Sequence, residues 1–434
     1  MRECGSSLRL CAIAVNEDKE AQSKMAEGMM SGGRAVFRIR DYSLYCLSRF
    51  LWGIGHHVQT ITIAWLIYEL TRDPLQLGLI GLVAFGPAVP LALVAGPAAD
   101  RYDRRSIIIL CGVVMAATST LMIATIASGY ISEARTWPLY ISTAVFAAAR
   151  AFAGPAGQAF VMSLVPKDKF TSAAAWNNTI NQSATIIGPS IGGLLIPFGT
   201  LVPFSVAFIC LTASALLATL ISARLLTGGK PPVTFEMLVA GYRFIWHNPV
   251  ILGAITLDLV AVMFAGVTAL LPIFANEIFD AGPWGFGILR SASSVGSVLA
   301  ALALANFTFQ YHVGRTMIAT VLIYGVATIT FGLAGNFFLG ILCLIIMGAV
   351  DMISVVIRQT LIQVEAPDAM RGRVVAVHSV TSGSANHLGE FESGVAARLI
   401  GVVPTVVFGG IAAVGCSIAW VKIFPALWNR EKFS

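Results

Sequence analysis

The stretch Gly96–Arg105, which reads GPAADRYDRR, separates two long apolar runs, Gln76–Ala95 and Ser106–Gly129. Each run is about 20 residues or longer, which is enough for a helix to cross the hydrocarbon core of a bilayer. The charged stretch between them is therefore predicted to be a tight turn at a membrane surface. Its three arginines predict that this surface is the cytoplasmic one.

The composition agrees with a membrane protein. Of the 434 residues 57% are hydrophobic and 12% are charged, and the mean hydropathy is +0.80. Soluble domains carry about 25% charged residues. The net charge of +6 is spread over short separate loops, so a nucleic-acid partner is not expected. Seven cysteines are scattered singly without C-x-x-C spacing, so no metal site is expected.

Twelve apolar segments are long enough to span a membrane, and spans in lipid must be helices because open strands leave polar groups unpaired. The first six are Tyr42–Tyr68, Gln76–Ala95, Ser106–Gly129, Pro138–Leu164, Thr171–Ile196 and Leu201–Ser222. The second six are Val250–Phe279, Trp284–Phe307, Thr316–Leu333, Phe337–Gln363, Val374–Leu399 and Val402–Ile423. The prediction is an all-α integral membrane protein with two six-helix halves, residues 41–222 and 249–425.

Loop charges predict the orientation. Lysines and arginines gather on the face that holds Gly96–Arg105, whereas the opposite face holds only Arg72 and Arg135. Both termini and the linker, residues 223–248, are therefore predicted to be cytoplasmic, in the inner (plasma) membrane of the cell. Residues 1–40 are interpreted as a disordered tail and residues 426–434 as a short one. Phe235–Trp246 has an amphipathic pattern and is expected to lie along the membrane surface as a helix.

An internal repeat supports two related halves. A shift of about 201 positions places Pro166, Gly188 and Gly193 on Pro367, Gly389 and Gly394. Consecutive halves of the same orientation are typical of duplication about an axis normal to the membrane.

Gly96–Arg105 resembles the loop between helices 2 and 3 of the major facilitator superfamily, G-x-x-x-D-R-x-G-R-R. Asp103 replaces the glycine of that pattern, as is common in the drug and siderophore exporter branch, which includes enterobactin exporters. The turns Leu70–Gly78 (LTRDPLQLG) and Pro367–Val374 (PDAMRGRV) also resemble this branch. The resemblance covers about Phe37 to Trp428 and implies the major facilitator fold, with two pseudo-symmetric halves around a central cavity.

The resemblance also implies a conformational latch, made by Gly96, Asp100, Arg101, Arg104 and Arg105. Asp100 would face the amino end of helix 11, where the helix dipole favours an anion. This contact would hold the outward-open state, because opening the cytoplasmic side breaks it. The alternative is that arginines such as Arg101 and Arg105 serve only to set the topology.

Helix 5 contains Gly188, Pro189, Gly192 and Gly193. These residues resemble the G-P-x-x-G-G core of the antiporter motif found in exporters of the superfamily. The glycines that the longer motif has upstream are replaced by Ala175 and Ala184. The motif favours export, and the alternative is ordinary close packing of small residues between membrane helices.

Ionisable residues inside spans are costly and are taken as functional candidates. They occur in helices 1, 4, 7, 8, 10 and 11, whereas the cores of helices 3, 6, 9 and 12 have none. The resemblance implies that helices 1, 4, 7 and 10 line the cavity. The candidates for proton coupling are Asp351, Asp258 and Glu390, and a fixed salt bridge to an arginine is the alternative for each.

Further polar residues are candidates for lining the cavity and binding substrate. They are Arg49, His56, Arg150, Asn177, Asn181 and Arg358. For the asparagines, hydrogen bonding between helices is the alternative.

The predicted function is secondary active transport: proton-coupled export of a drug, siderophore or metabolite, by a monomer in the lipid bilayer. No enzyme activity or cofactor is expected, because the H-x-x-x-H and phosphate-binding G-x-x-x-x-G-K-[ST] patterns are missing from the sequence and no pair of a nucleophile and a base stands out. The alternatives are proton-coupled uptake, or a non-transporting receptor or scaffold of transporter fold.

Overall fold

The computed structural model describes residues 36–222, 235–264, 266–306 and 312–432. Within these ranges all regular structure is helical. Residues 1–35 of the predicted tail and 223–234 of the predicted linker lie outside the described residues. The described part of the linker forms α8 (Phe235–His247).

Six long helices make up the first set. They are α2 (Arg40–Thr71), α3 (Pro74–Arg101), α4 (Arg104–Ala127), α5 (Trp137–Leu164), α6 (Phe170–Leu195) and α7 (Leu201–Thr219). Short 3-10 turns lie beside them at Val36–Arg38, Lys167–Lys169 and Ile196–Phe198. Within the set, α2 packs on α6 and α7, α3 packs on α5, and α4 packs on α5 and α7.

The second set follows α8. Its long helices are α9 (Pro249–Phe264), α11 (Gly282–Asn306), α12 (Val313–Gly332), α13 (Phe337–Glu365), α14 (Asp368–Ile400) and α15 (Val402–Ile423). Shorter elements are η4 (Val267–Leu270), α10 (Leu271–Ile273), η5 (Phe274–Ile278) and α16 (Pro425–Trp428). In this set α11 packs on α13, and α12 packs on α13 and α15.

The seventh predicted span is not one continuous helix, unlike the expected run Val250–Phe279. Helix α9 ends at Phe264, and the chain continues through the 3-10 turn η4, α10 and the π-helical turn η5. Gly266 lies at this interruption, where a β-carbon would come within 3.3 Å of the backbone of Gly389 on α14. Irregular backbone at membrane depth is tolerated where it packs against protein, as it does here.

Among the described residues, seven helices are long and apolar enough by composition to cross a membrane. They include α4, α7, α12 and α15, whose outer faces expose large apolar side chains such as Leu110, Ile209, Val326 and Phe408. By contrast α2, α5, α6 and α14 carry more polar residues. Of these four, α6 packs on α11 and α14 packs on α3, so the polar residues of α6 and α14 lie on helices that join the two sets.

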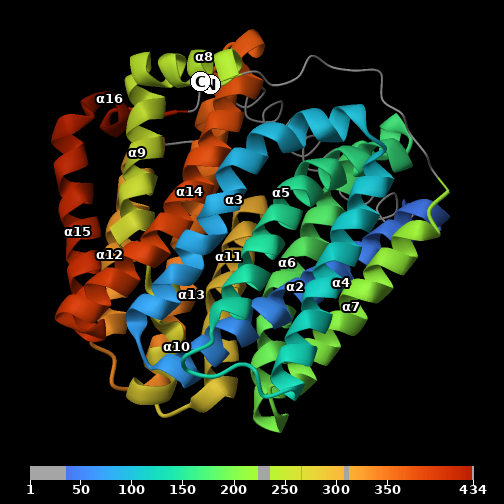
Figure 1. Ribbon diagram of the computed structural model, residues 1–434. Coiled ribbons are helices and arrows are strands. Elements are labelled where there is room, and N and C mark those ends of the chain that lie inside the picture. The colour runs from blue at the N-terminus through green and yellow to red at the C-terminus, as the bar shows by residue number, and fades with distance from the viewer. Residues whose placement is uncertain (1–35, 223–234, 265, 307–311, 433–434) are drawn as a thin grey trace, which may run out of the picture.

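The bundle has two ends. The Arg101 end holds the α3–α4 turn, the start of α2 and α8, and the Thr71 end holds the α2–α3 turn, α10 and the end of α14. Figure 1 shows α8 lying across the Arg101 end, while α10 lies at the opposite end. In the same view α15 and α7 lie on opposite sides of the molecule, and α3 and α14 run side by side between them.

Local sequence explains how α3 and α4 begin. The Asp73 carboxylate accepts a hydrogen bond from the Leu75 backbone amide (3.0 Å), and Pro74 occupies the first turn of α3. The Asp103 carboxylate accepts hydrogen bonds from the backbone amide (3.2 Å) and hydroxyl (2.8 Å) of Ser106. Aspartate is a favoured N-cap residue, so Asp103, which replaces a glycine of the family pattern, helps to start α4.

Candidate functional site

The two sets meet most closely at two glycine pairs. A β-carbon on Gly193 of α6 would lie 2.7 Å from the α-carbon of Gly287 on α11. A β-carbon on Gly394 of α14 would lie 2.6 Å from the α-carbon of Gly78 on α3. Gly193 and Gly394 are related by the 201-residue repeat, so both copies of this glycine occupy a crossing between the sets. Only glycine permits backbones to approach this closely.

Polar contacts between the sets lie towards the Thr71 end, close to these crossings. The Tyr68 hydroxyl donates to the Glu277 carboxylate (2.8 Å) and accepts from the Asn276 side chain (2.9 Å). Arg398 of α14 forms an ion pair with Asp73 (3.1 Å). Together with the glycine pairs, these contacts close the Thr71 end in this structure.

The rest of the helix 5 motif packs within the first set. A β-carbon on Gly188 would lie 2.6 Å from the β-carbon of His57, and one on Gly192 would collide with the Ile61 side chain. Pro189 is buried inside α6. The motif therefore places α6 tightly against α2 and, through Gly193, against α11.

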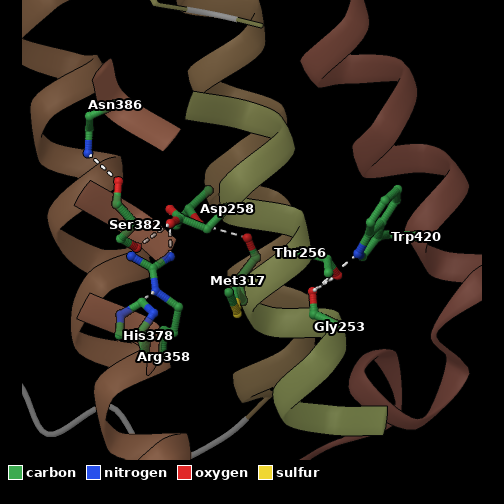
Figure 2. Close-up of polar contacts among 10 residues, drawn as sticks. Gly253, Thr256, Asp258, Met317, Arg358, His378, Ser382, Asn386 and Trp420 are labelled. Atoms are coloured by element: carbon green, nitrogen blue, oxygen red, sulfur yellow. Dashed lines mark hydrogen bonds and ion pairs between the residues drawn. The ribbon is translucent and has the colours of Figure 1, made fainter. Parts of the chain in front are cut away.

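A buried ion pair lies in the second set (Figure 2). The Arg358 guanidinium of α13 is 2.6 Å from the Asp258 carboxylate of α9, and both side chains are less than 10% exposed. Arg358 also donates to the imidazole of His378 on α14 (3.3 Å), and the Ser382 hydroxyl donates to Asp258 (3.4 Å). Both charges are therefore compensated in a site that three helices assemble.

Asp351 lies beside this pair. It lines a small cavity with Asp258, Thr320, Tyr324 and Ser354. Its carboxylate interacts electrostatically with Asp258 and Arg358 but forms no ion pair with a described residue. Two carboxylates thus share a single nearby guanidinium, and the second one is unmatched.

A different cluster begins on α2. The Arg49 guanidinium lies over the Trp52 ring at 4.5 Å from its centroid. The Trp52 ring stacks on His56, and His56 stacks on Phe146 of α5. Arg49 is 9% exposed, and its Nε and Nη1 atoms are buried without a hydrogen-bond partner in the described part of the chain.

Charged residues from both sets complete the cluster. Arg150 of α5 interacts electrostatically with Arg49 and with Glu390 of α14, and Arg290 of α11 also interacts with Glu390. The positive charges of Arg150 and Arg290 also act on the His57 imidazole. The structure therefore brings Arg49, His56, Arg150 and Glu390 together, and it places Arg358 and Asp258 in the separate site.

Two further sequence-based candidates lie on α6. Asn177 and Asn181 are half-buried on α6, and the Asn177 side-chain oxygen has no hydrogen-bond partner in the described ranges. No group of three or more His, Cys, Asp or Glu side chains that would hold a metal ion occurs among the described residues.

The residues of the predicted latch have mixed environments. Arg104 donates to the backbone oxygens of Ala99 and Ala159, and Arg105 donates to those of Ala218 and Thr219, all within the first set. Arg101 is exposed, and a β-carbon on Gly96 would meet open space. The Asp100 side chain lies outside the described part of the structure, so the latch stays a prediction.

Sequence reasoning missed His378, although a usable signal was present. His378 lies as many residues after Asp368 as Arg358 lies before it, and residues equally spaced from a tight turn face each other across antiparallel helices. Tyr68, Asn276 and Glu277 were also missed, because their pairing spans about 200 residues and no local pattern indicates it.

Comparisons with known proteins agree with this architecture. A family model described as a transmembrane secretion effector matches residues 32–429. The enterobactin exporter EntS of Escherichia coli O1:K1 is 26% identical over 351 residues, which are 79% of each chain. The EntS protein of Shigella boydii serotype 18 matches with the same identity and coverage.

Solved structures share the fold. A POT family transporter in complex with 5-aminolevulinic acid matches with a TM-score of 0.71 and 13% identity, over 89% of this chain and 96% of that chain. A mutant of the nucleoside transporter NupG matches with a TM-score of 0.72 and 12% identity, over 88% of this chain and all of that chain (100%). The predicted fold class, an all-α membrane protein of the major facilitator fold, is confirmed.

Proposed function

Because the chain belongs to the transmembrane secretion effector family, we propose that it exports a small organic molecule in exchange for protons. Family and fold identify a multi-pass membrane transporter for a small molecule and not an enzyme. The proposal adds the direction, the coupling ion and the orientation. Both termini face the cytoplasm, and the protein works as a monomer in the inner membrane.

The observation that supports proton coupling is the Asp351 carboxylate, which lies beside the Asp258–Arg358 pair without an arginine of its own. Two carboxylates close together in a poorly solvated site are not both charged at low cost. One proton on Asp351 relieves the repulsion while Arg358 stays paired with Asp258. Losing that proton makes the two carboxylates compete for one guanidinium, which changes how α9, α13 and α14 pack around it.

Alternating access follows from the two sets moving as units, residues 41–222 against 249–425. The Thr71 end is closed by Gly193–Gly287, Gly394–Gly78 and the Tyr68 contacts. In the proposed orientation the Arg101 end faces the cytoplasm, so this conformation receives substrate from inside the cell. Opening the Thr71 end then releases it outside. In that second state the Asp100 latch would close the Arg101 end.

Two observations favour export over uptake. The relatives of Escherichia coli and Shigella are named enterobactin exporters. The Gly188–Gly193 motif, which resembles the antiporter motif of exporters, makes a contact between the sets through Gly193. Glu390 is the next candidate for coupling, because it lies between the sets near Arg150 and Arg290.

The test uses everted membrane vesicles with an imposed pH gradient. Acidifying the lumen should drive accumulation of the transported compound by the wild type. Asp351→Asn should abolish this accumulation while leaving the protein inserted and still able to exchange substrate without a gradient. Glu365→Gln, which changes a carboxylate that pairs with Arg430 near the Arg101 end, is the matched control. Unchanged gradient-driven accumulation by Asp351→Asn would move the role to Asp258 or Glu390.

A further inference from the structure

The cluster between the two sets holds an excess of positive charge. Arg49, Arg150 and Arg290 contribute three guanidiniums, and Glu390 is the one carboxylate that interacts with Arg150 and Arg290. Glu390 itself lies 3.5 Å from the imidazole of His387. None of the three arginines forms an ion pair with a described residue. With neutral histidines, two positive charges are left over.

Arg150 and Arg290 lie near the middle of the bundle along its length, where Arg150 is exposed and Arg290 is half-buried. Arg150 is 13 residues from the start of α5 and Arg290 is eight residues from the start of α11. At about 1.5 Å per residue they are roughly 20 Å and 12 Å from the Thr71 end. An uncompensated charge at such depth is costly, so the position predicts either water or a partner of opposite charge.

Arg49 provides an independent sign of a missing partner. Its side chain is about nine-tenths buried, yet two of its guanidinium nitrogens have no hydrogen-bond partner among the described residues. Buried donors are normally satisfied, and each exception calls for an explanation. The Trp52 ring supports the cation on one face but accepts no conventional hydrogen bond.

Unfilled space leads from the cluster towards the Arg101 end. Gly154 follows Arg150 by one helical turn on the same face of α5, and a β-carbon there would meet no atom within 4 Å. Gln158, one turn further, is exposed, and Arg150 itself is exposed. Because Arg150 interacts with Glu390 of the other set, this face lies between the sets rather than against lipid.

We propose that Arg150 and Arg290, with Arg49 behind them, form the binding site for an acidic group, so that the exported substrate is an organic anion. A carboxylate, sulfonate or phosphate supplies the charge that the cluster lacks, and guanidinium groups bind such oxyanions with paired hydrogen bonds. This inference rests on the proposed export function, since it names the substrate class for that transport. The bound anion balances the excess positive charge of the three arginines. The excess returns when the ligand dissociates.

The first test needs no knowledge of the substrate. Purified protein is placed in nanodiscs of zwitterionic phosphatidylcholine at low ionic strength, and its thermal unfolding midpoint is measured. Arg150→Gln and Arg290→Gln should each raise the midpoint by a few degrees, because each removes one of three like charges that a single carboxylate does not balance. Arg135→Gln, in an exposed loop at the Thr71 end, should leave it unchanged. A lower midpoint for both cluster variants would show that the arginines have a structural partner and would overturn the proposal.

The second test uses three ligands that share one ring and differ in charge: 1-naphthoate, 1-naphthylmethanol and 1-naphthylmethylammonium. Naphthoate should raise the midpoint of the wild type and of Arg135→Gln, and this rise should be lost in Arg150→Gln and Arg290→Gln. The proposal is overturned by a flat response to naphthoate, by an equal response to the ammonium compound, or by a naphthoate response that survives both substitutions. An equal response to sodium sulfate would mean an inorganic anion site only.

The outcomes also separate this inference from proton coupling. Naphthoate should still raise the unfolding midpoint of Asp351→Asn, because Asp351 lies on α13 in the second set and Arg150 lies on α5 in the first. If everted vesicles show no dependence on the pH gradient but the naphthoate response persists, the coupling proposal fails and the anion site remains. If transport depends on the pH gradient but naphthoate does not raise the unfolding midpoint, the anion site is overturned and the coupling proposal remains.

Discussion

Gly193 and Gly287 meet so closely that a β-carbon on Gly193 would lie 2.7 Å from the Gly287 α-carbon and 2.8 Å from the Pro283 carbonyl oxygen. Both obstacles are backbone atoms, which cannot move aside as a flexible side chain would. Gly394 meets Gly78 in the same way at the related crossing. The Thr71 end therefore closes through two contacts that no larger residue at Gly193 or Gly394 would allow.

Gly193→Ala should shift the protein away from the state that is closed at the Thr71 end. Overpacking of this kind costs about 1–3 kcal/mol, which corresponds to a change of roughly fivefold to 150-fold in the ratio of states. Spin labels at Glu133 and Phe338, both exposed at the Thr71 end, would report a longer distance by electron paramagnetic resonance. Gly415→Ala on α15, where a β-carbon meets open space, is the matched control. Identical distance distributions for Gly193→Ala and the control would refute this role.

Asp258→Asn should destabilise the protein by about 3–5 kcal/mol, because it leaves the Arg358 charge buried without its partner. The double variant Asp258→Asn with Arg358→Gln should recover part of this loss, since neither charge then remains. Thermal unfolding in detergent measures both effects. A double variant no more stable than the single one would mean that Asp351, not Asp258, compensates Arg358.

Tyr68→Phe should weaken closure at the Thr71 end without disturbing the helices. The substitution removes the hydroxyl that donates to Glu277 and accepts from Asn276. A net contribution of about 0.5–1.5 kcal/mol for each of the two hydrogen bonds predicts a rise of roughly fivefold to 150-fold in the ratio of open to closed protein. The Glu133–Phe338 label pair measures this change, and Tyr130→Phe, in the loop after α4, serves as the control. No change in the distance distribution would contradict the prediction.

Asp100→Asn should slow turnover without changing which compounds are recognised, if Asp100 holds the second conformation by its contact with the start of α14. Substrate competition profiles should match those of the wild type while the maximal rate falls. Asp103→Asn is a useful comparison, because asparagine caps helices as well as aspartate does. Wild-type turnover in Asp100→Asn would remove the latch from the mechanism.

The fold was largely predictable because short stretches of sequence determine it. Gly96–Arg105, the lengths of the apolar runs and the charge asymmetry of the loops each act over a few residues. The break near Gly266 was not predicted, since an apolar run gives the same pattern whether its helix is continuous or interrupted. The helix ends there, where Gly266 packs closely against Gly389, a residue more than 100 positions away in the sequence.

The site was predictable in its residue types but not in its pairing. Asp258, Asp351, Arg150 and Glu390 were identified as costly charges at membrane depth. Which charges meet depends on how α9, α13 and α14 rotate against one another, and packing of side chains across helices sets that rotation. The division into a compensated site around Asp258 and an uncompensated one around Arg150 is therefore visible only in three dimensions.

The Asp73–Arg398 pair lies where the Arg398 side chain is 55% exposed. Exposed ion pairs contribute about 0–1 kcal/mol, and dissolved salt screens them. The ionic strength of the solution at the Thr71 end therefore affects how strongly this ion pair holds the two sets together. The conformation closed at the Thr71 end should therefore be slightly more populated at low ionic strength than at high ionic strength.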